Sequence, residues 1–425
     1  MSERVRVVIT GSGAVCGTGR TPAAMLAAVL EGRSAVAPIQ QWDTTGWPVR
    51  VAAEVADFNA REFVPDRKLH KFIRRTDMFG IYAGTQAIAG SAFVPHRATL
   101  APEAAADYSD RTGIYVGSGG GAYNTQYDYF PLMAEAGGDL VRFGQELGNV
   151  VNPMWLLRAL PNNVLCHVGI NHNLKGANAC ITNHCCGGTL AVIEAAEALR
   201  HEEADRAVAI GHDTLIEPQM VLYYNQCGLL ADDALRPFDA ARRGSVFGEG
   251  AGALVLETEA SARARGAAIL GEVLGGGNAG EATGLLAIRD DGDGLARAIG
   301  DALHDAKLGP ADIGMVVAHG NGTPQSDATE AAALRRVFGN AMPPVTAFKW
   351  SIGHLIAAAG IIETTIALAA LAQGVVPGVA TFASLDPDCA GVTVSAAPQA
   401  PRGKIALILC RGFAGTDAAL IVRAA

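Results

Sequence analysis

The sequence predicts an α/β protein built from two pseudo-repeated halves and folded as a five-layered αβαβα sandwich. Strand-like and helix-like segments alternate along the chain, which is typical of mixed α/β layers. The order of these segments starts again after residue 257. Two predicted helices, over 190–199 and 355–371, lack a polar face of normal width, and such helices are usually buried. Placing both between two sheets, with other helices outside, gives the five layers.

Length, composition and charge narrow the class of protein. The chain has 425 residues, of which 50% are apolar, and a formal net charge of −9. This length allows two or more domain-sized units with a large core. The acidic balance argues against a nucleic-acid partner. No stretch reaches the roughly 18 apolar residues of a membrane span.

The N-terminus and the cysteines predict a cytoplasmic protein. Residues 1–6 are charged, and the apolar run Val7–Ile9 is far shorter than the apolar core of a signal peptide. The eight cysteines show no CxxC or disulfide-framework spacing. We therefore expect reduced thiols in the cytoplasm.

The first predicted element is a buried strand followed by a glycine-rich turn, in the segment RVRVVITGSGAVCGTG over residues 4–19. Its glycines at 11, 13 and 17 do not fit the dinucleotide-binding pattern GxGxxG, because Cys16 stands at the last glycine position. The glycine spacing therefore argues against a nucleotide site here.

Alternating elements follow. Helices are expected over 21–31 and 74–92, with an irregular stretch over 38–70 between them. A buried strand ending in glycines is expected over 111–121. Residues 122–163 hold most of the tyrosine and tryptophan of the chain, and we expect an irregular excursion that caps a pocket or a subunit interface, or forms a surface loop with its own small core.

The central stretch, 177–200, reads ANACITNHCCGGTLAVIEAAEALR and places cysteines at the start of a predicted helix. A thiol at that position meets unpaired backbone N–H groups and the positive end of the helix dipole, which both favour the thiolate. Cys185 and Cys186 are therefore candidate nucleophiles. On this stretch alone, a buried structural cysteine pair is an equally good interpretation.

The second half repeats this order. After strands over 206–211 and within 237–257, the chain has a helix over 292–306, a strand with glycines over 311–322 and a helix within 351–371. Phe413–Val422 also echoes Phe247–Leu256.

The repeat predicts two halves, 1–257 and 258–425, with one cleft at their junction. Glu194 follows Cys185 by nine residues, and Glu363 follows His354 by nine. This equal spacing predicts that Cys185 and His354 occupy pseudo-equivalent helix starts and face the same cleft.

Seven segments, in order, carry a family resemblance. They are VVITGSGAV, RTGIYVGSG, LKGANACITNHCC, PFDAARRGSVFGEGAGALVLE, VVAHGNGTPQSDATE, KWSIGHLIAAAG and GFAGTD. Over nearly its whole length the chain resembles a β-ketoacyl-acyl carrier protein synthase, a condensing enzyme of the thiolase-like superfamily. Each motif alone is weak, but seven in family order are specific. The resemblance implies a thiolase-like fold, with the nucleophile in the first half and two catalytic histidines in the second.

The resemblance selects the catalytic residues. The family nucleophile lies nine residues after the glycine of LKG, which is Cys185 here, whereas Cys180 falls five residues early. His319 in AHGNGTP and His354 in GHLIAAAG match the family's catalytic pair. The resemblance implies that Lys349 is a supporting residue and that Glu330 is the acidic residue that engages it. It implies that the backbone N–H groups of Cys185 and Phe413 form the oxyanion hole, with Phe413 also acting as the gate. Asn321 and Thr323 stand at positions that bind phosphopantetheine.

The implied reaction is a decarboxylative Claisen condensation of an acyl group on Cys185 with a malonyl thioester. It needs no metal and no permanently bound cofactor, because an acyl carrier protein brings each substrate on phosphopantetheine. The resemblance also implies a homodimer, or a heterodimer with a ketosynthase paralogue, paired through residues near 177–182.

Several positions depart from the family pattern, which favours a specialised polyketide, polyene or unusual acyl substrate over housekeeping elongation. They are Asn183, His184, Cys186, Arg243, Asn321 and Arg411. Three alternatives stay open: a non-catalytic chain-length-factor-like subunit, a coenzyme A-dependent thiolase using Cys410, and a scaffold protein. Cys185 with both histidines argues against the first, and His354 with Lys349 against the second.

Overall fold

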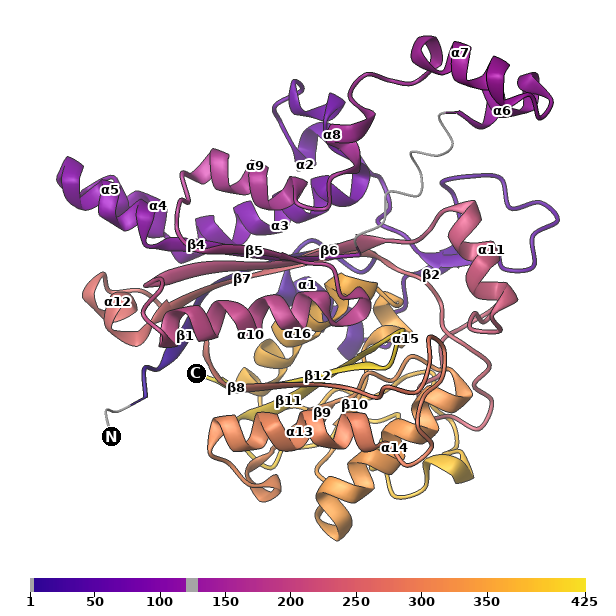
Figure 1. Ribbon diagram of the computed structural model, residues 1–425. Helices are drawn as coiled ribbons and strands as arrows, with labels where there is room; N and C mark the ends of the chain where they lie inside the picture. The colour runs from indigo at the N-terminus through magenta and orange to yellow at the C-terminus, as the bar shows by residue number, and fades with distance from the viewer. Residues whose placement is uncertain (1–3, 120–128) are drawn as a thin grey trace.

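The computed structural model describes residues 4–119 and 129–425, and its ten main strands fall into two half-sheets of the same order (Figure 1). One half runs β5-β4-β6-β7-β1 and the other β10-β9-β11-β12-β8. In both, the first three strands are parallel and the last two antiparallel to their neighbours. The strands are β1 (Val7–Cys16), β4 (Thr112–Ser118), β5 (Asn178–Ile181), β6 (Arg206–Thr214), β7 (Glu249–Thr258), β8 (Gly271–Gly280), β9 (Met315–Val317), β10 (Val345–Thr346), β11 (Ile405–Gly412) and β12 (Thr416–Ala424).

The half-sheets meet where β1 pairs with β8. Val7, Val8 and Ile9 pair antiparallel with Val273, Glu272 and Gly271, which makes one continuous ten-stranded sheet. The sequence predicted two separate sheets. In Figure 1 the halves still lie as two layers, because the sheet bends at this short junction and helices fill the space between them.

Helices form the other three layers (Figure 1). The helices α3 (Arg75–Ser91) and α9 (Asn163–His172) cover the outer face of the N-terminal half-sheet, and α13 (Asp293–Ala306) and α14 (Pro324–Phe338) lie outside the other. The helices α10 (Gly187–Arg200) and α16 (Ala359–Ala372) lie in the middle, with α1 (Pro22–Leu30) against α16. The five-layered αβαβα prediction is thereby confirmed, and one hydrophobic core fills the middle layer.

The two middle helices repeat one local structure, three residues away from the predicted register. Each is preceded by a single 3-10 turn, His184–Cys186 before α10 and Ile356–Ala358 before α16. Both turns begin at a residue with positive φ, 45° at His184 and 50° at Ile356. The backbone therefore equates Cys185 with Ala357, and the equal spacing to Glu194 and Glu363 is a coincidence of sequence.

The glycines of the first strand pack a helix instead of forming a turn. The strand β1 continues through residue 16, and a Cβ on Gly13 would lie 2.1 Å from the carbonyl oxygen of Ala83 in α3. A Cβ on Gly11 would lie 2.3 Å from the carbonyl oxygen of Ala87. The predicted turn therefore comes later, over residues 17–19, and Gly11 and Gly13 belong to the strand, because α3 lies so close that these two positions have no room for a side chain.

The excursion between β4 and α9 contains helices, although the sequence predicted irregular structure. Its first residues, 122–128, lie outside the described residues, and then come α6 (Phe130–Ala136), α7 (Leu140–Val150) and α8 (Trp155–Ala159). These helices project from the N-terminal half in Figure 1. Leu140 is 79% exposed and Leu156 is 56% exposed. In the described ranges, no helix is both long and apolar enough to cross a membrane.

The remaining elements are short and lie at the edges of the layers. The small hairpin pairs β2 (Val36–Pro38), which ends where the stretch predicted to be irregular begins, with β3 (Val51–Ala53), inside it. The other helices are α2 (Ala60–Phe63), α4 (Phe93–Arg97), α5 (Pro102–Asp110), α11 (Pro218–Gln226), α12 (Glu259–Ala264) and α15 (Lys349–Ile352).

Candidate active site

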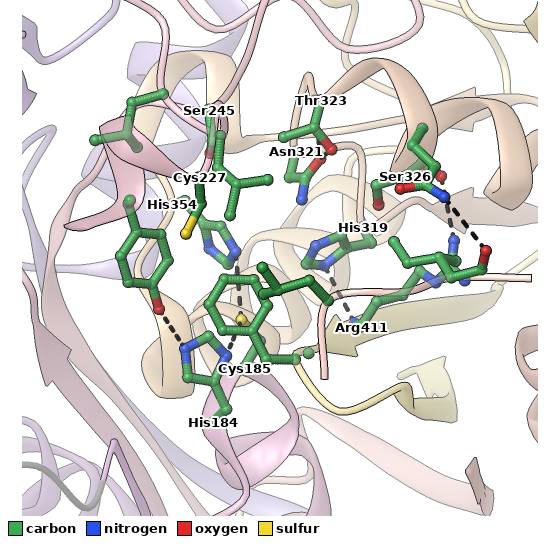
Figure 2. A pocket seen from close by; sticks show the side chains of 18 of the residues that line it. His184, Cys185, Cys227, Ser245, His319, Asn321, Thr323, Ser326, His354 and Arg411 are labelled. Atoms are coloured by element: carbon green, nitrogen blue, oxygen red, sulfur yellow. Dashed lines mark hydrogen bonds between the residues drawn. The ribbon is translucent and has the colours of Figure 1, made fainter. Parts of the chain in front are cut away.

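A cavity of about 310 Å³ opens where the two halves meet, and it collects most of the predicted site residues (Figure 2). Six of them line it: Cys185, His319, Asn321, Thr323, His354 and Phe413. The other two, Lys349 and Glu330, are fully buried. Cys185 and His354 thus share one cavity, as predicted, although the register on which that prediction rested was wrong.

Cys185 occupies the 3-10 turn before α10, and its side chain faces the histidines. The residue is 3% exposed, and its Sγ lies 3.4 Å from Nε2 of His354. The other two candidate thiols face elsewhere, because Cys180 donates to the carbonyl of Pro161 and Cys186 to that of Thr416. This geometry supports Cys185 as the nucleophile.

Backbone hydrogen bonds set the tautomer of both histidines. The N–H of Ile356 donates to Nδ1 of His354 at 3.3 Å, and the N–H of Arg411 donates to Nδ1 of His319 at 3.3 Å. A neutral imidazole whose Nδ1 accepts must carry its proton on Nε2. The rings lie 5.2 Å apart at 78°. The cavity therefore receives two N–H donors near the thiol.

Burial and a nearby cation keep these histidines neutral. Burial, with the positive charge of Lys349 next in size, lowers the pKa of His319 and His354 well below the usual value. Burial raises the pKa of the Cys185 thiol well above 9, against the lowering effect of Lys349. The sequence predicted a thiolate stabilised by the helix start. In the buried site the resting group is a thiol, so a proton acceptor is needed for attack.

Glu330 holds the turn that carries His319. Its carboxylate accepts hydrogen bonds from the backbone N–H groups of His319 at 2.7 Å and Gly320 at 2.9 Å. The expected ion pair of Glu330 with Lys349 is not the one that forms. Both carboxylate oxygens of Glu330 face this turn, whereas α16 brings a different acid to the lysine.

That acid is Glu363. Its Oε1 lies 2.7 Å from Nζ of Lys349, and both side chains are fully buried. Burial raises the pKa of Glu363 to about 7, while the ammonium of Lys349 lowers it. The sequence held the signal for this pair, because Glu363 is an acidic residue inside an otherwise apolar helix, a position that demands a partner.

The segment carrying Phe413 runs beside Cys185. A Cβ placed on Gly412 would lie 3.4 Å from the backbone nitrogen of Cys185, so the two predicted oxyanion-hole segments are adjacent. The Phe413 ring stacks on His184 with centroids 4.9 Å apart. The role of the two N–H groups in an oxyanion hole stays a prediction.

Asn321 and Thr323 form a small polar turn at the cavity wall. Oδ1 of Asn321 accepts from the backbone N–H of Thr323 at 3.0 Å and from its hydroxyl at 2.9 Å. In Figure 2 the amide nitrogen of Asn321 points away from Thr323, toward the space that His319 borders. This wall can therefore offer an amide donor to a polar ligand in the cavity.

Arg411 also lines the cavity, but its charge is used inside the protein. Its guanidinium donates to Asp417 at 2.8 Å, Glu281 at 2.7 Å and Thr329 at 2.6 Å. Arg411 is one of the departures from the family pattern, and it fixes β11 and β12 against α14. The sequence identified this departure but did not predict the carboxylates that neutralise the charge of Arg411.

In the sequence, His184 stood out only as a departure from the family pattern, whereas in the structure it contacts the nucleophile directly. Its Nδ1 lies 3.0 Å from Sγ of Cys185, and its Nε2 lies 2.6 Å from the hydroxyl of Tyr224 (Figure 2). A histidine immediately before a candidate nucleophile was the available signal. Tyr224, on α11, carried none, because nothing in the sequence predicts that α11 reaches this cavity.

In the described parts of the chain, no group of three or more His, Cys, Asp or Glu residues is arranged to hold a metal ion. The side chains that line the cavity supply acid–base, nucleophilic and hydrogen-bonding groups. A thiol, two Nε2–H donors and an adjacent imidazole suit acyl transfer and stabilisation of an enolate.

Known proteins resemble this chain over its whole length. The family models described as β-ketoacyl synthase, N-terminal domain, and β-ketoacyl synthase, C-terminal domain, match residues 4–262 and 270–383. The 3-oxoacyl-[acyl-carrier-protein] synthase 2 of Vibrio harveyi is 31% identical, over 100% of this chain and 99% of its own. A solved β-ketoacyl synthase from Burkholderia phymatum STM815 is 28% identical, with a TM-score of 0.87 over 99% of this chain and 100% of its own. The solved ishigamide ketosynthase/chain length factor is also 28% identical, with a TM-score of 0.85 over 100% of both chains.

Proposed function

Because this chain belongs to the β-ketoacyl synthase family, we propose that it condenses an acyl group held on Cys185 with a malonyl group on acyl carrier protein. The carrying observation is one cavity in which Sγ of Cys185 lies 3.4 Å from Nε2 of His354 and a second Nε2–H donor, His319, stands beside it. The enzyme is an acyltransferase of the condensing class. The product is a β-ketoacyl thioester two carbons longer.

In the first half-reaction, Cys185 becomes acylated. Its sulfur attacks the thioester carbonyl of the incoming acyl carrier, the carrier thiol leaves, and an acyl-enzyme remains. The charge on the tetrahedral oxygen needs donors that are already in place. The backbone N–H groups of Cys185 and Phe413 are the proposed donors, since their two segments run side by side.

In the second half-reaction, the two histidines act on the malonyl thioester. Loss of CO2 leaves negative charge on the thioester oxygen, and Nε2–H donors of His319 and His354 stabilise that enolate. Neutral histidines suit this role because their low pKa prevents proton transfer to the enolate. The carbanion then attacks the acyl carbon, the bond to the Cys185 sulfur breaks, and Cys185 leaves as a thiolate that takes up one proton from solvent.

The phosphopantetheine arm of the carrier would enter along the wall formed by Asn321 and Thr323. Both residues line the cavity, and the arm is rich in amides that pair with amide and hydroxyl groups. The carrier protein is thus both the substrate vehicle and the expected partner. No permanently bound cofactor takes part in the proposed reaction.

A second ketosynthase-type chain is the other proposed partner. The strand β5 lies at the end of the sheet order with one neighbour, β4, and its residues are partly exposed. An edge strand of this kind is a site for pairing with another chain. The helices α6–α8, which expose several large apolar side chains, lie in the same half. Whether the second chain is a copy or a paralogue is open to test, and the ishigamide neighbour is a ketosynthase/chain length factor.

The substrate proposed is a specialised acyl chain, as in polyketide or polyene synthesis, and the support is the wall of the acyl site. His184, Tyr224 and Phe413 stack beside the thiol with centroid distances of 4.9–6.3 Å. This stack of three rings, with His184 in contact with the nucleophile, restricts which acyl groups fit. A panel of acyl carriers, followed by mass analysis of the Cys185 peptide, would identify the group accepted. A coenzyme A-dependent thiolase-like activity would instead give labelling from acyl-coenzyme A alone.

Separating the two half-reactions tests the proposal. Cys185→Ala should abolish acylation and condensation, whereas Cys180→Ala should keep most of both. His319→Ala and His354→Ala should still be acylated on Cys185 but should lose about 10²–10³-fold in CO2 release from malonyl carrier. Cys185→Gln, a neutral replacement for the acylated thiol, should release CO2 without condensing.

The observables are labelled CO2 and intact-protein mass. Brisk CO2 release by both histidine variants would refute the role assignment. Sedimentation at micromolar concentration tests the assembly, since a monomer that still condenses would contradict pairing through residues 177–182.

A further inference from the structure

We propose that His184 is the proton acceptor for the Cys185 thiol and that Tyr224 positions it. This assignment deepens the proposed function and rests on it for the acyl-transfer step. The evidence is geometric: Nδ1 of His184 is 3.0 Å from Sγ of Cys185, and Nε2 of the same ring is 2.6 Å from the Tyr224 hydroxyl.

The other histidine near the thiol, His354, cannot accept the thiol proton in its present tautomer. Its Nδ1 accepts the backbone N–H of Ile356, so its Nε2 carries a proton and points a donor at Sγ. A thiol proton cannot move to a nitrogen that already holds one in a neutral ring. His184 is different, because its Nε2–H can donate to Tyr224 and leave the lone pair of Nδ1 facing the thiol.

Two aromatic rings hold the ring of His184 in this orientation. It stacks on Phe413 at 15° with centroids 4.9 Å apart and lies nearly parallel to Tyr224, with an interplanar angle of 14°. Tyr224 is itself fixed by an edge contact with Phe247 at 4.9 Å. An imidazolium formed here would lie over an aromatic face, which stabilises a cation.

The backbone at His184 belongs to the repeated turn. Its φ is 45° at the start of the 3-10 turn, and the pseudo-equivalent Ile356 has a φ of 50°. This region of backbone conformation is strained for a non-glycine residue. Asparagine or glycine would fit this backbone better, yet the chain places an imidazole there.

The charged and titratable groups around His184 come from each element packed against it. They are Cys185 on its own turn, Tyr224 on α11, and His354 and His319 from the C-terminal half. Burial lowers the pKa of His184 to about 4. The resting pair is therefore neutral imidazole and thiol, with proton transfer during attack.

The step balances in protons and electrons. The thiol proton moves from Sγ to Nδ1 as the sulfur lone pair forms the bond to the acyl carbon. The carbonyl electrons return as the bond to the carrier sulfur breaks, and the proton on Nδ1 goes to that leaving sulfur. His184 ends as it began, the carrier leaves as a free thiol, and no oxidant or other reactant is needed.

The test is alkylation of Cys185 by iodoacetamide, which needs no acyl carrier. His184→Gly suits the positive φ and leaves a space, whereas His184→Phe keeps an aromatic ring without nitrogen. Both should alkylate Cys185 at least about 100-fold more slowly than the unaltered protein near neutral pH, the low end of what a positioned base contributes. Added imidazole should restore His184→Gly in a saturable manner but not His184→Phe. Tyr224→Phe should show a smaller loss.

Labelling of the half-buried Cys180, read in the same peptide digest, controls for general opening of the fold. Unchanged or faster alkylation of Cys185 in His184→Phe would overturn the proposal, and so would failure of imidazole to rescue His184→Gly. If imidazole rescue succeeds but malonyl carrier is never condensed, His184 stands as the base and only the proposed condensation falls.

Discussion

Removing the charge of Lys349 should destabilise the protein in a way that depends on pH. The Nζ of Lys349 lies 2.7 Å from Oε1 of Glu363, and neither side chain is exposed to solvent. Lys349→Met keeps a long apolar side chain in the same space but leaves the carboxyl of Glu363 without its cation. The carboxyl must then be buried as an unpaired charge or take up a proton.

The structure sets the size of the effect. At an effective dielectric constant of about 20, two unit charges 2.7 Å apart attract by roughly 6 kcal/mol. Desolvation offsets part of this attraction, and removing one partner of a buried pair costs about 3–5 kcal/mol in the free energy of unfolding. Without Lys349, the pKa of Glu363 rises further above its present value of about 7.

The sign of the pH dependence follows. A carboxyl in the unfolded chain titrates near 4.3, so a raised folded pKa gives stability that is present at low pH and is lost as pH rises. The deficit of Lys349→Met should therefore grow by about 1.4 kcal/mol for each pH unit between the two folded pKa values of Glu363, with and without Lys349.

The assay is urea unfolding at pH 6 and pH 8, at one fixed protein concentration, followed by tryptophan fluorescence. Trp350 is buried next to Lys349 and reports on this region. The double variant Lys349→Met/Glu363→Leu is the matched control, and it should recover most of the lost stability because no charge is left unpaired. An equal deficit at both pH values, together with no recovery in the double variant, would refute the reasoning.

Three further changes test other parts of the structure. Gly13→Ala puts a methyl group 2.1 Å from a helix carbonyl and should cost about 3 kcal/mol or more of unfolding free energy, whereas Gly90→Ala, whose nearest atom would be 4.0 Å away, should cost less than about 1 kcal/mol in urea titrations. Glu330→Gln can satisfy only one of two backbone N–H groups, so CO2 release should fall about tenfold while acylation of the thiol, seen by mass, persists. Burial lowers the pKa of His212 to about 4, below the unfolded value near 6.5, so its contribution to stability is lost as pH falls. Between pH 7 and pH 5.5 the unfolding free energy of the unaltered protein should therefore fall by about 1.2 kcal/mol more than that of His212→Gln in urea titrations.

The sequence alone determined the layers and the main site. Apolar periodicity without a polar face predicted that α10 and α16 are buried, because a helix with no polar side has nowhere else to lie. The recurring order of strands and helices predicted two halves. Ordered motifs, including LKGANACITNHCC and KWSIGHLIAAAG, singled out Cys185 and His354, and the structure brings their side chains to 3.4 Å.

Tertiary structure decided every contact that depends on the approach of distant segments. In the sequence, the glycines of β1 indicate a turn, because local glycine patterns do not distinguish a turn from a close helix contact. The position of α3 shows that they make the helix contact. From the sequence, either Glu330 or Glu363 could pair with Lys349. Only the position of α16 in the fold shows that Glu363 is the partner. His184 meets Tyr224 because α11 crosses the cavity. Side-chain partners are set by three-dimensional distance, which residue spacing does not encode beyond a single element.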